Sequence, residues 1–202
     1  MPRATRRFPR FLAPRLREAL SDTPVVLVHG PRQSGKTTLA RQVGERRGHR
    51  YYSFDDDVAR AAAEADPVGF VAELPERVIL DEVQRVPALF TALKSAVDRK
   101  PSPGRFILTG SANVLLLPRL ADSLAGRIGL LRLHPLAQSE LAGKASRFLD
   151  ALFDARFPTR SSERLGAALA ERVVDGGYPA ALLRSRGARR AAWYRDYVET
   201  QI

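Results

Sequence analysis

One short segment near the N-terminus has the residue types and the spacing of a phosphate-binding loop. Residues 30–37 fit the pattern G-x-x-x-x-G-K-[ST], and with the next residue they read Gly30-Pro31-Arg32-Gln33-Ser34-Gly35-Lys36-Thr37-Thr38. Glycines let the backbone approach a ligand closely, so that successive N–H groups can surround phosphate oxygens. Lys36 can reach the β- and γ-phosphates as a binding and a catalytic residue, and the Thr37 hydroxyl can bind Mg²⁺. We therefore predict that residues 30–38, here called the phosphate loop, bind a nucleoside triphosphate with Mg²⁺.

A pair of acids completes this chemistry about fifty residues after the loop begins, where the apolar run Val78–Leu80 is followed by Asp81 and Glu82. An acid at the tip of a buried strand can hold the Mg²⁺ shell, so Asp81 joins Thr37 as a predicted metal-binding residue. The adjacent carboxylate of Glu82 can act as a general base on the attacking water. The acid pair favours hydrolysis over transfer to a small molecule, and the missing N-K-x-D signature argues against GTP.

A further polar segment, residues 109–113, follows another apolar run. Ser111 or Asn113 could contact the γ-phosphate or hold the water, and we include both as candidate catalytic residues. The alternative is a strand-to-helix turn in which Ser111 caps a helix.

The elements that must position these residues alternate between strands and helices. A parallel sheet covered by helices on both faces explains such short apolar strands, so we predict a three-layer α/β core. The predicted strands are 25–28, 51–54, 78–80, 106–108 and 128–133, and the predicted helices are 37–47, two within 58–73, one opened by Pro87, and 113–124.

Beyond Pro135 the sequence predicts helices only, over 138–153, 162–174 and 188–202. The expected organisation is an N-terminal helix over 1–20, the core over 21–136, and a helical extension over 137–202. The last helix carries Trp193, Tyr194 and Tyr197, which either are exposed or belong to a helix that docks on the core. Because no cap ends this helix, we expect the extension to begin a longer C-terminal domain.

Charge and composition restrict the partners. The net charge is +11 with a pI near 10.9, which suits nucleic acid as a partner. The alternative is an arginine-rich composition without such a role, since only four of the 33 basic residues are lysine. No cysteines are present, and His29, His49 and His134 are too scattered for a metal cluster. No apolar run approaches the ~20 residues that span a bilayer, so we expect a cytoplasmic protein without a membrane partner.

The motifs together resemble a family of bacterial and archaeal AAA-type ATPases, in which an AAA domain precedes a C-terminal domain of unknown function. The shared segments, in order, are the phosphate loop, Leu80–Gln84, Leu108–Ser111, Leu124–Arg127 and Gly176–Pro179. The resemblance implies ATP as the nucleotide.

Arg127 acquires a candidate role from the same resemblance. AAA-type ATPases often place an arginine just before the fifth strand, where it reaches the γ-phosphate of a neighbouring subunit. We therefore expect a homo-oligomer in which Arg127 is catalytic; the alternative is a solvated surface arginine.

Three functions remain open on the sequence alone. The first is an Mg²⁺-dependent ATPase that couples hydrolysis to a conformational or interaction change. The second is a nucleotide-dependent regulatory switch with little turnover, acting on DNA or on a protein partner. The third is a P-loop kinase.

Overall fold

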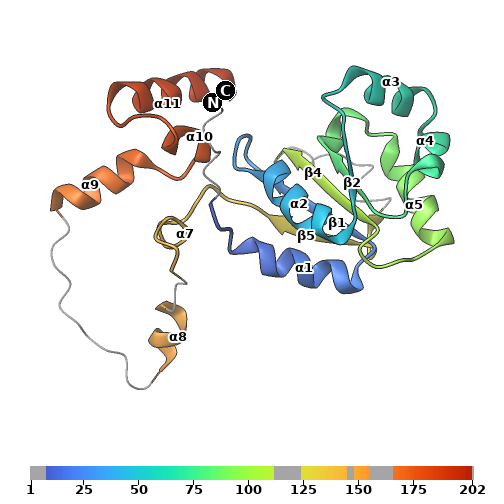
Figure 1. Ribbon diagram of the computed structural model, residues 1–202, viewed down its shortest axis with the longest axis horizontal. Helices are drawn as coiled ribbons and strands as arrows, with labels where there is room; N and C mark the ends of the chain where they lie inside the picture. Colours follow the sequence, from blue (N-terminus) through green and yellow to red (C-terminus); the bar gives the residue numbers. More distant parts are fainter. Residues whose placement is uncertain (1–7, 112–123, 145–147, 155–165, 202) are drawn as a thin grey trace. The chain divides into compact units, whose positions relative to one another are not determined.

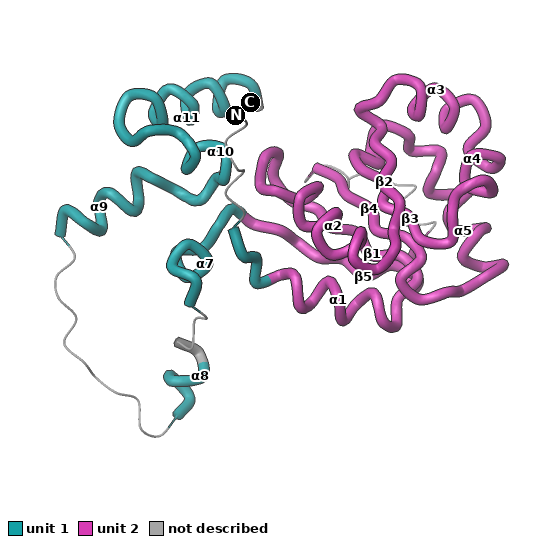
Figure 2. The backbone as a smooth tube through the Cα atoms, in the orientation of Figure 1, with its two compact units in different colours: residues 1–11, 135–202 teal, residues 12–134 magenta. Residues whose placement is uncertain are grey.

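The computed structural model describes residues 8–111, 124–144, 148–154 and 166–201. The chain divides into two units: residues 12–134, here called the core unit, and residues 1–11 with 135–202, here called the C-terminal unit (Figure 2). Residues near the N-terminus belong to the second unit because the buried Glu140 carboxylate accepts hydrogen bonds from Phe11 N at 2.7 Å and from Arg10 Nε at 3.2 Å.

A five-stranded sheet forms the centre of the core unit (Figure 1). Its order is β2-β3-β4-β1-β5 and every neighbouring pair is parallel, so all five strands end at the same edge of the sheet. This order places β4 between β1 and β3, so the ends of these three strands lie side by side. The strands are β1 (Val25–Gly30), β2 (Arg50–Ser53), β3 (Val78–Asp81), β4 (Phe106–Ser111) and β5 (Ile128–Arg132).

Both faces of this sheet are buried, which explains the continuous apolar runs in the strands. Val26 and Val28 pack toward α1 and α2, whereas Val25 and Leu27 pack toward the side of α3, α4 and α5. The predicted three-layer α/β fold is confirmed. The helices of the core unit are α1 (Leu12–Asp22), α2 (Lys36–Gly44), α3 (Asp57–Ala65), α4 (Pro67–Glu73) and α5 (Leu89–Arg99), with the 3-10 turns η1 (Glu45–Arg47) and η2 (Val83–Arg85).

One helix predicted for the C-terminal unit is divided in the structure. The single helix predicted over 138–153 is wrong: α7 ends at Leu141, and Gly143 then adopts a left-handed φ of 64°, which a continuing helix does not allow. The helix predicted over 113–124 lies outside the described residues except for Leu124. The helices are α7 (Gln138–Leu141), α8 (Phe148–Phe153), α9 (Gly166–Asp175), α10 (Pro179–Leu182) and α11 (Ala188–Gln201).

Residues 176–179, which contributed to the family resemblance, form the turn between α9 and α10. Gly176 has a φ of 61°, and a Cβ there would collide with the Tyr194 hydroxyl. A Cβ on Gly177 would collide with the Leu136 carbonyl, because Leu136 N donates to Gly177 O at 2.7 Å. Packing therefore explains why both positions are glycine.

The aromatic side chains of α11 pack together with Tyr178. The rings of Trp193 and Tyr197 stack at 5.1 Å, and Tyr178 lies 4.9 Å from Tyr197. Trp193 is only 8% exposed and its ring lies 5.6 Å from that of Tyr178, so exposure does not describe this residue, which packs within the C-terminal unit.

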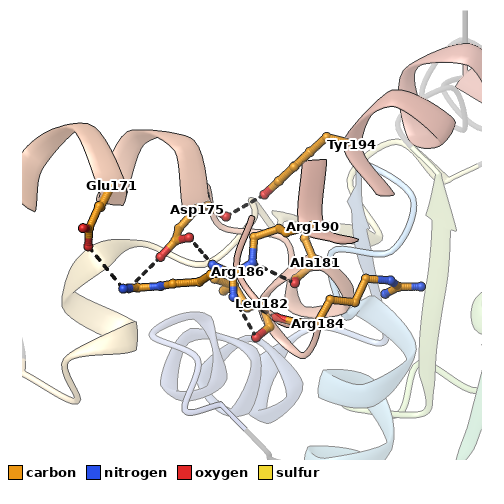
Figure 3. Close-up of polar contacts among 8 residues, drawn as sticks. All are labelled: Glu171, Asp175, Ala181, Leu182, Arg184, Arg186, Arg190 and Tyr194. Carbon is orange, nitrogen blue, oxygen red and sulfur yellow. Dashed lines mark hydrogen bonds and ion pairs between the residues drawn. The ribbon is translucent and has the colours of Figure 1, made fainter. Parts of the chain in front are cut away.

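Asp175, at the end of α9, contacts Arg186 and two residues of α11, Arg190 and Tyr194 (Figure 3). Its carboxylate pairs with Arg190 and, at 2.8 Å, with Arg186, and its carbonyl accepts from the Tyr194 hydroxyl at 2.8 Å. The buried Arg190 also donates to the carbonyls of Ala181, Leu182 and Arg184. A hollow of about 430 Å³ beside these residues is lined in part by Arg190, and each of the three guanidinium nitrogens of Arg190 already donates a hydrogen bond.

No helix within the described ranges is long and apolar enough to cross a membrane.

Candidate nucleotide-binding site

The phosphate loop connects the end of β1 to the start of α2, and its backbone is bent as the motif requires. Gly35 caps α2 with a φ of 97°, and Gly30 has a φ of 151°. A Cβ on Gly30 would collide with the Leu133 carbonyl, so only glycine fits there. Gln33 is one of two described non-glycine residues with positive φ, at 59°, a conformation that costs roughly 1–3 kcal/mol. Such strain is typical of loops that are shaped for a ligand.

Lys36 lies inside this loop. The residue is only 4% exposed, and its Nζ donates to the Pro31 carbonyl at 3.0 Å. Burial lowers the pKa of Lys36, while the negative charges of Glu82 and Asp81 oppose that shift. Within the described part of the chain this buried ammonium donates to a neutral carbonyl, and it is well placed to bind a phosphate oxygen instead.

Thr37 and Asp81 are in direct contact although 44 positions separate them in the chain. The Thr37 hydroxyl donates to the two Asp81 carboxylate oxygens at 2.9 and 3.1 Å, and Asp81 is 4% exposed. Because the hydroxyl gives its proton to the carboxylate, its own lone pairs remain available to a cation. A hydroxyl and a carboxylate are the oxygen ligands that Mg²⁺ prefers, so the residues present fit a magnesium–nucleotide complex.

Two further hydroxyls reach Asp81, and the sequence analysis missed both. The Tyr51 hydroxyl donates to Oδ2 at 2.8 Å, and the Thr109 hydroxyl donates to Oδ1. Tyr51 is in β2 and Thr109 is in β4, the two strands that flank β3. The sequence did mark residues 109–113 as polar, but only the strand order shows that Thr109 faces the acid.

Glu82 follows Asp81 with an unusual backbone. Its φ of 58° and ψ of 43° lie in the left-handed region. Glycine adopts this region readily and asparagine and aspartate do so occasionally, whereas other residues are disfavoured there. Two contacts hold it there: Glu82 N donates to Thr109 Oγ1 at 3.3 Å, and Gln84 Nε2 donates to the Glu82 carboxylate. Strained backbone of this kind is concentrated at functional sites, and here it turns the predicted base away from the direction of β3.

Ser111 and Thr38 are two further predicted site residues that the structure describes. Ser111 is the last residue of β4 and pairs in register with Gly30, so it lies beside the first residue of the phosphate loop. Thr38 is an exposed residue in the first turn of α2. Asn113 lies outside the described residues.

Arg127 is far from the phosphate loop of its own chain. It immediately precedes β5 and therefore lies at the edge where the strands begin, opposite the edge where β1 leads into the loop. Its guanidinium pairs with Asp98 near the end of α5 and donates to the Ala125 carbonyl at 3.1 Å. Any contact of Arg127 with a γ-phosphate would therefore require a second copy of the chain.

Thr109 provides a first prediction. Thr109→Val keeps the shape of this fully buried side chain but leaves Glu82 N–H without its acceptor and Asp81 without one donor. We expect the free energy of unfolding to fall by about 1–3 kcal/mol in urea titrations, because buried polar groups become unpaired. Thr109→Ser, which retains the hydroxyl, is the matched control; equal stability of the two variants would contradict the role of the hydroxyl.

Comparison with known proteins adds the following. Residues 22–142, more than half of the chain, match the family model of an AAA domain. Two uncharacterized proteins, from Mycobacterium bovis and Mycobacterium tuberculosis, are each 34% identical over 192 residues, covering 95% of this chain and 38% of each relative. The chain thus spans less than half the length of these relatives.

Solved structures with a similar fold include a DNA replication initiation factor, with a TM-score of 0.48 and 21% identity over 74% of this chain and 55% of that chain. AMPPCP-bound DnaA from Aquifex aeolicus aligns with a TM-score of 0.47 and 17% identity, over 92% of this chain and 59% of that chain.

The matched residues run from the end of α1 to α7, and they include the phosphate loop, the acid pair and all five strands. The chain belongs to the AAA-domain family of the P-loop ATPases.

Proposed function

We propose that this protein binds ATP with Mg²⁺ at residues 30–38 and hydrolyses it, and that the cycle changes its conformation or its interactions. The observation that carries the proposal is the direct contact between Thr37 and Asp81, with the strained Glu82 immediately after it. These residues would supply a cation-binding pair and a base at the edge of the sheet where β1, β3 and β4 end. A cytoplasmic location, where ATP and Mg²⁺ are abundant, is part of the same proposal.

Each residue has one task in this reaction. Lys36 and the loop N–H groups bind the phosphates, and Thr37 and Asp81 would hold Mg²⁺, which would supply positive charge to the phosphate groups. Glu82 accepts a proton from a water molecule, whose oxygen bonds to the γ-phosphorus as the bond to the bridging oxygen breaks, giving ADP and phosphate. Ser111, beside Gly30, and Asn113 are proposed to contact the γ-phosphate or the water.

The test is phosphate release from ATP by the purified chain, with Mg²⁺ and with a chelator in its place. We expect release only with Mg²⁺, and only weakly from GTP. Transfer of the γ-phosphate to a small molecule, with no release to water, would instead identify a kinase.

One contact favours a second candidate, a nucleotide-dependent switch with little turnover. Gln84 holds the Glu82 carboxylate, and its own Oε1 is buried with no hydrogen-bond partner among the described residues. A base held in this way is not free to approach water until Gln84 moves. Nucleic acid is the partner suggested by the net charge of +11. Turnover measured with and without duplex DNA separates the candidates, since a switch stays slow in both conditions.

Arg127 provides a prediction about assembly. We propose that it contacts the γ-phosphate bound by a neighbouring copy, since it lies at the opposite edge of the sheet from its own loop. Arg127→Ala should lower turnover and leave ATP affinity nearly intact, because the guanidinium acts on charge that develops in the transition state. Mixing Arg127→Ala with Glu82→Gln should recover activity, because some mixed sites contain an intact Glu82 and an intact neighbouring Arg127.

Arg99→Ala is the control for this experiment, because Arg99 is an exposed arginine at the end of α5, next to Asp98 in the chain. It should change neither turnover nor recovery on mixing. Absence of recovery, together with light scattering that shows a monomer in the presence of ATP, would make Arg127 a surface partner of Asp98 and nothing more.

A further inference from the structure

Three hydroxyl groups surround the Asp81 carboxylate, one from the phosphate loop and two from the neighbouring strands. Oδ1 accepts from Thr37 at 2.9 Å and from Thr109, and Oδ2 accepts from Tyr51 at 2.8 Å. A longer contact of 3.1 Å from Thr37 also reaches Oδ2. A carboxylate has about four acceptor positions, two on each oxygen. The single Thr37 proton is counted on Oδ1, to which its contact is shorter. Oδ1 is then filled by two hydroxyls, Oδ2 holds Tyr51, and one acceptor position on Oδ2 remains.

Tyr51 is well fixed for this contact. It precedes Ser53 by two positions in β2, and Ser53 pairs in register with Asp81, so all three side chains are on the same face of the sheet. The Arg41 guanidinium lies 4.7 Å from the centre of the Tyr51 ring. The phenol hydroxyl is thereby directed at Asp81 Oδ2.

We propose that Tyr51 is a positioning residue that fixes the Asp81 carboxylate, so that its remaining acceptor position is turned to the magnesium shell of the bound nucleotide. This inference rests on the proposed function, since it concerns the same site. Tyr51 acts through Asp81 and touches neither nucleotide nor metal. Without its hydroxyl, two acceptor positions on Oδ2 are open and the carboxylate can rotate, so the geometry offered to the metal is lost.

The neighbouring tyrosine provides a matched control. Tyr52 lies on the opposite face of β2, where its ring packs edge-on against Phe70 at a centroid distance of 6.4 Å. Tyr51→Phe and Tyr52→Phe each remove one hydroxyl from adjacent, half-buried tyrosines, and both keep the ring. Only the first removes a donor to Asp81, and it preserves the ring on which Arg41 stacks.

The experiment measures binding and not turnover. Calorimetry with a non-hydrolysable ATP analogue gives the dissociation constant with Mg²⁺ and with EDTA, and the ratio of the two is the gain that Mg²⁺ provides. We expect Tyr51→Phe to reduce this gain about tenfold or more, the typical effect of removing a partner that orients a metal-binding group. Affinity in EDTA should equal that of the parent, and Tyr52→Phe should match the parent under both conditions. Asp81→Asn, which removes the carboxylate charge, should lose the whole gain in affinity that Mg²⁺ provides.

The outcomes separate the two proposals. A parent protein that does not bind the analogue with Mg²⁺ overturns the proposed function and this inference with it. A parent that gains from Mg²⁺, with a Tyr51→Phe variant that gains as much, overturns the role of Tyr51 alone. The role of Tyr51 is also overturned if Tyr51→Phe weakens binding of the analogue equally in EDTA and in Mg²⁺. A general structural defect would lower the affinity by the same factor in both conditions.

Discussion

Glu82→Gln should still bind ATP with Mg²⁺ and lose roughly a hundredfold or more in turnover. The substitution keeps the length of the side chain and an oxygen that can accept the hydrogen bond from Gln84, so the local structure is preserved. It removes only the ability to take a proton from water. Two quantities are measured, steady-state phosphate release and the affinity for ATP. The substitution should lower kcat and leave the affinity unchanged.

Glu76→Gln is the control, because this glutamate is exposed and pairs with Lys100 at 2.6 Å, with no contact to the candidate site. It should hydrolyse ATP at the parent rate. Were Glu82→Gln equally active, another residue would be the base, or the residual rate of both proteins would be that of a switch.

The backbone of Glu82 adds a reason to expect a role beyond packing. At a φ of 58° a glycine would be unstrained, whereas glutamate costs roughly 1–3 kcal/mol. The side chain is half-buried, and its carboxylate accepts a hydrogen bond from Gln84. A carboxylate kept in such a position is consistent with the general base proposed for it.

The fold could be predicted from local patterns because each of its elements has a local signal. Apolar runs such as Val25–Val28 and Val78–Leu80 can be satisfied only when both faces of a sheet are covered, and glycine or proline separates most elements. The fold class and the family were therefore predicted and confirmed. The contact between Thr37 and Asp81 also follows from the pattern, since the motif presupposes that the two strands end at one edge.

The contacts of Tyr51 and Thr109 could not be predicted in this way. Both depend on β2 and β4 being the neighbours of β3, and no residue in the strands encodes that order by itself. Had the strand order been known, the alternation of side chains along β2 would have shown that Tyr51 is on the same face as Asp81 and Tyr52 on the opposite face. Gly143 illustrates the second limit: the apolar spacing over 138–153 suits one helix, but a left-handed residue at a single position ends it.

Lys36→Ala should weaken ATP binding by at least about tenfold, or ~1.4 kcal/mol, without unfolding the protein. Lys36 provides the full positive charge that the loop holds inside itself, and its ammonium contacts the Pro31 carbonyl at 3.0 Å. When the nucleotide binds, a charged phosphate oxygen is a stronger partner than that neutral carbonyl. The measurement is calorimetry with ATP, and Lys100→Ala, which removes an exposed lysine, should bind as the parent does.

The stability of the same variant tests whether Lys36 is present for binding and not for folding. Burial lowers the pKa of Lys36 below its usual value of about 10.5, so the folded state disfavours the charged amine. This cost is fully present below both pKa values, and it declines as the pH rises through the lowered pKa toward 10.5. Removing the amine removes the cost, so Lys36→Ala should unfold in urea at pH 7 at a concentration no lower than the parent requires. A clear loss of stability with unchanged ATP affinity would instead identify Lys36 as a structural residue, and the phosphate-binding role of residues 30–38 would have to be abandoned.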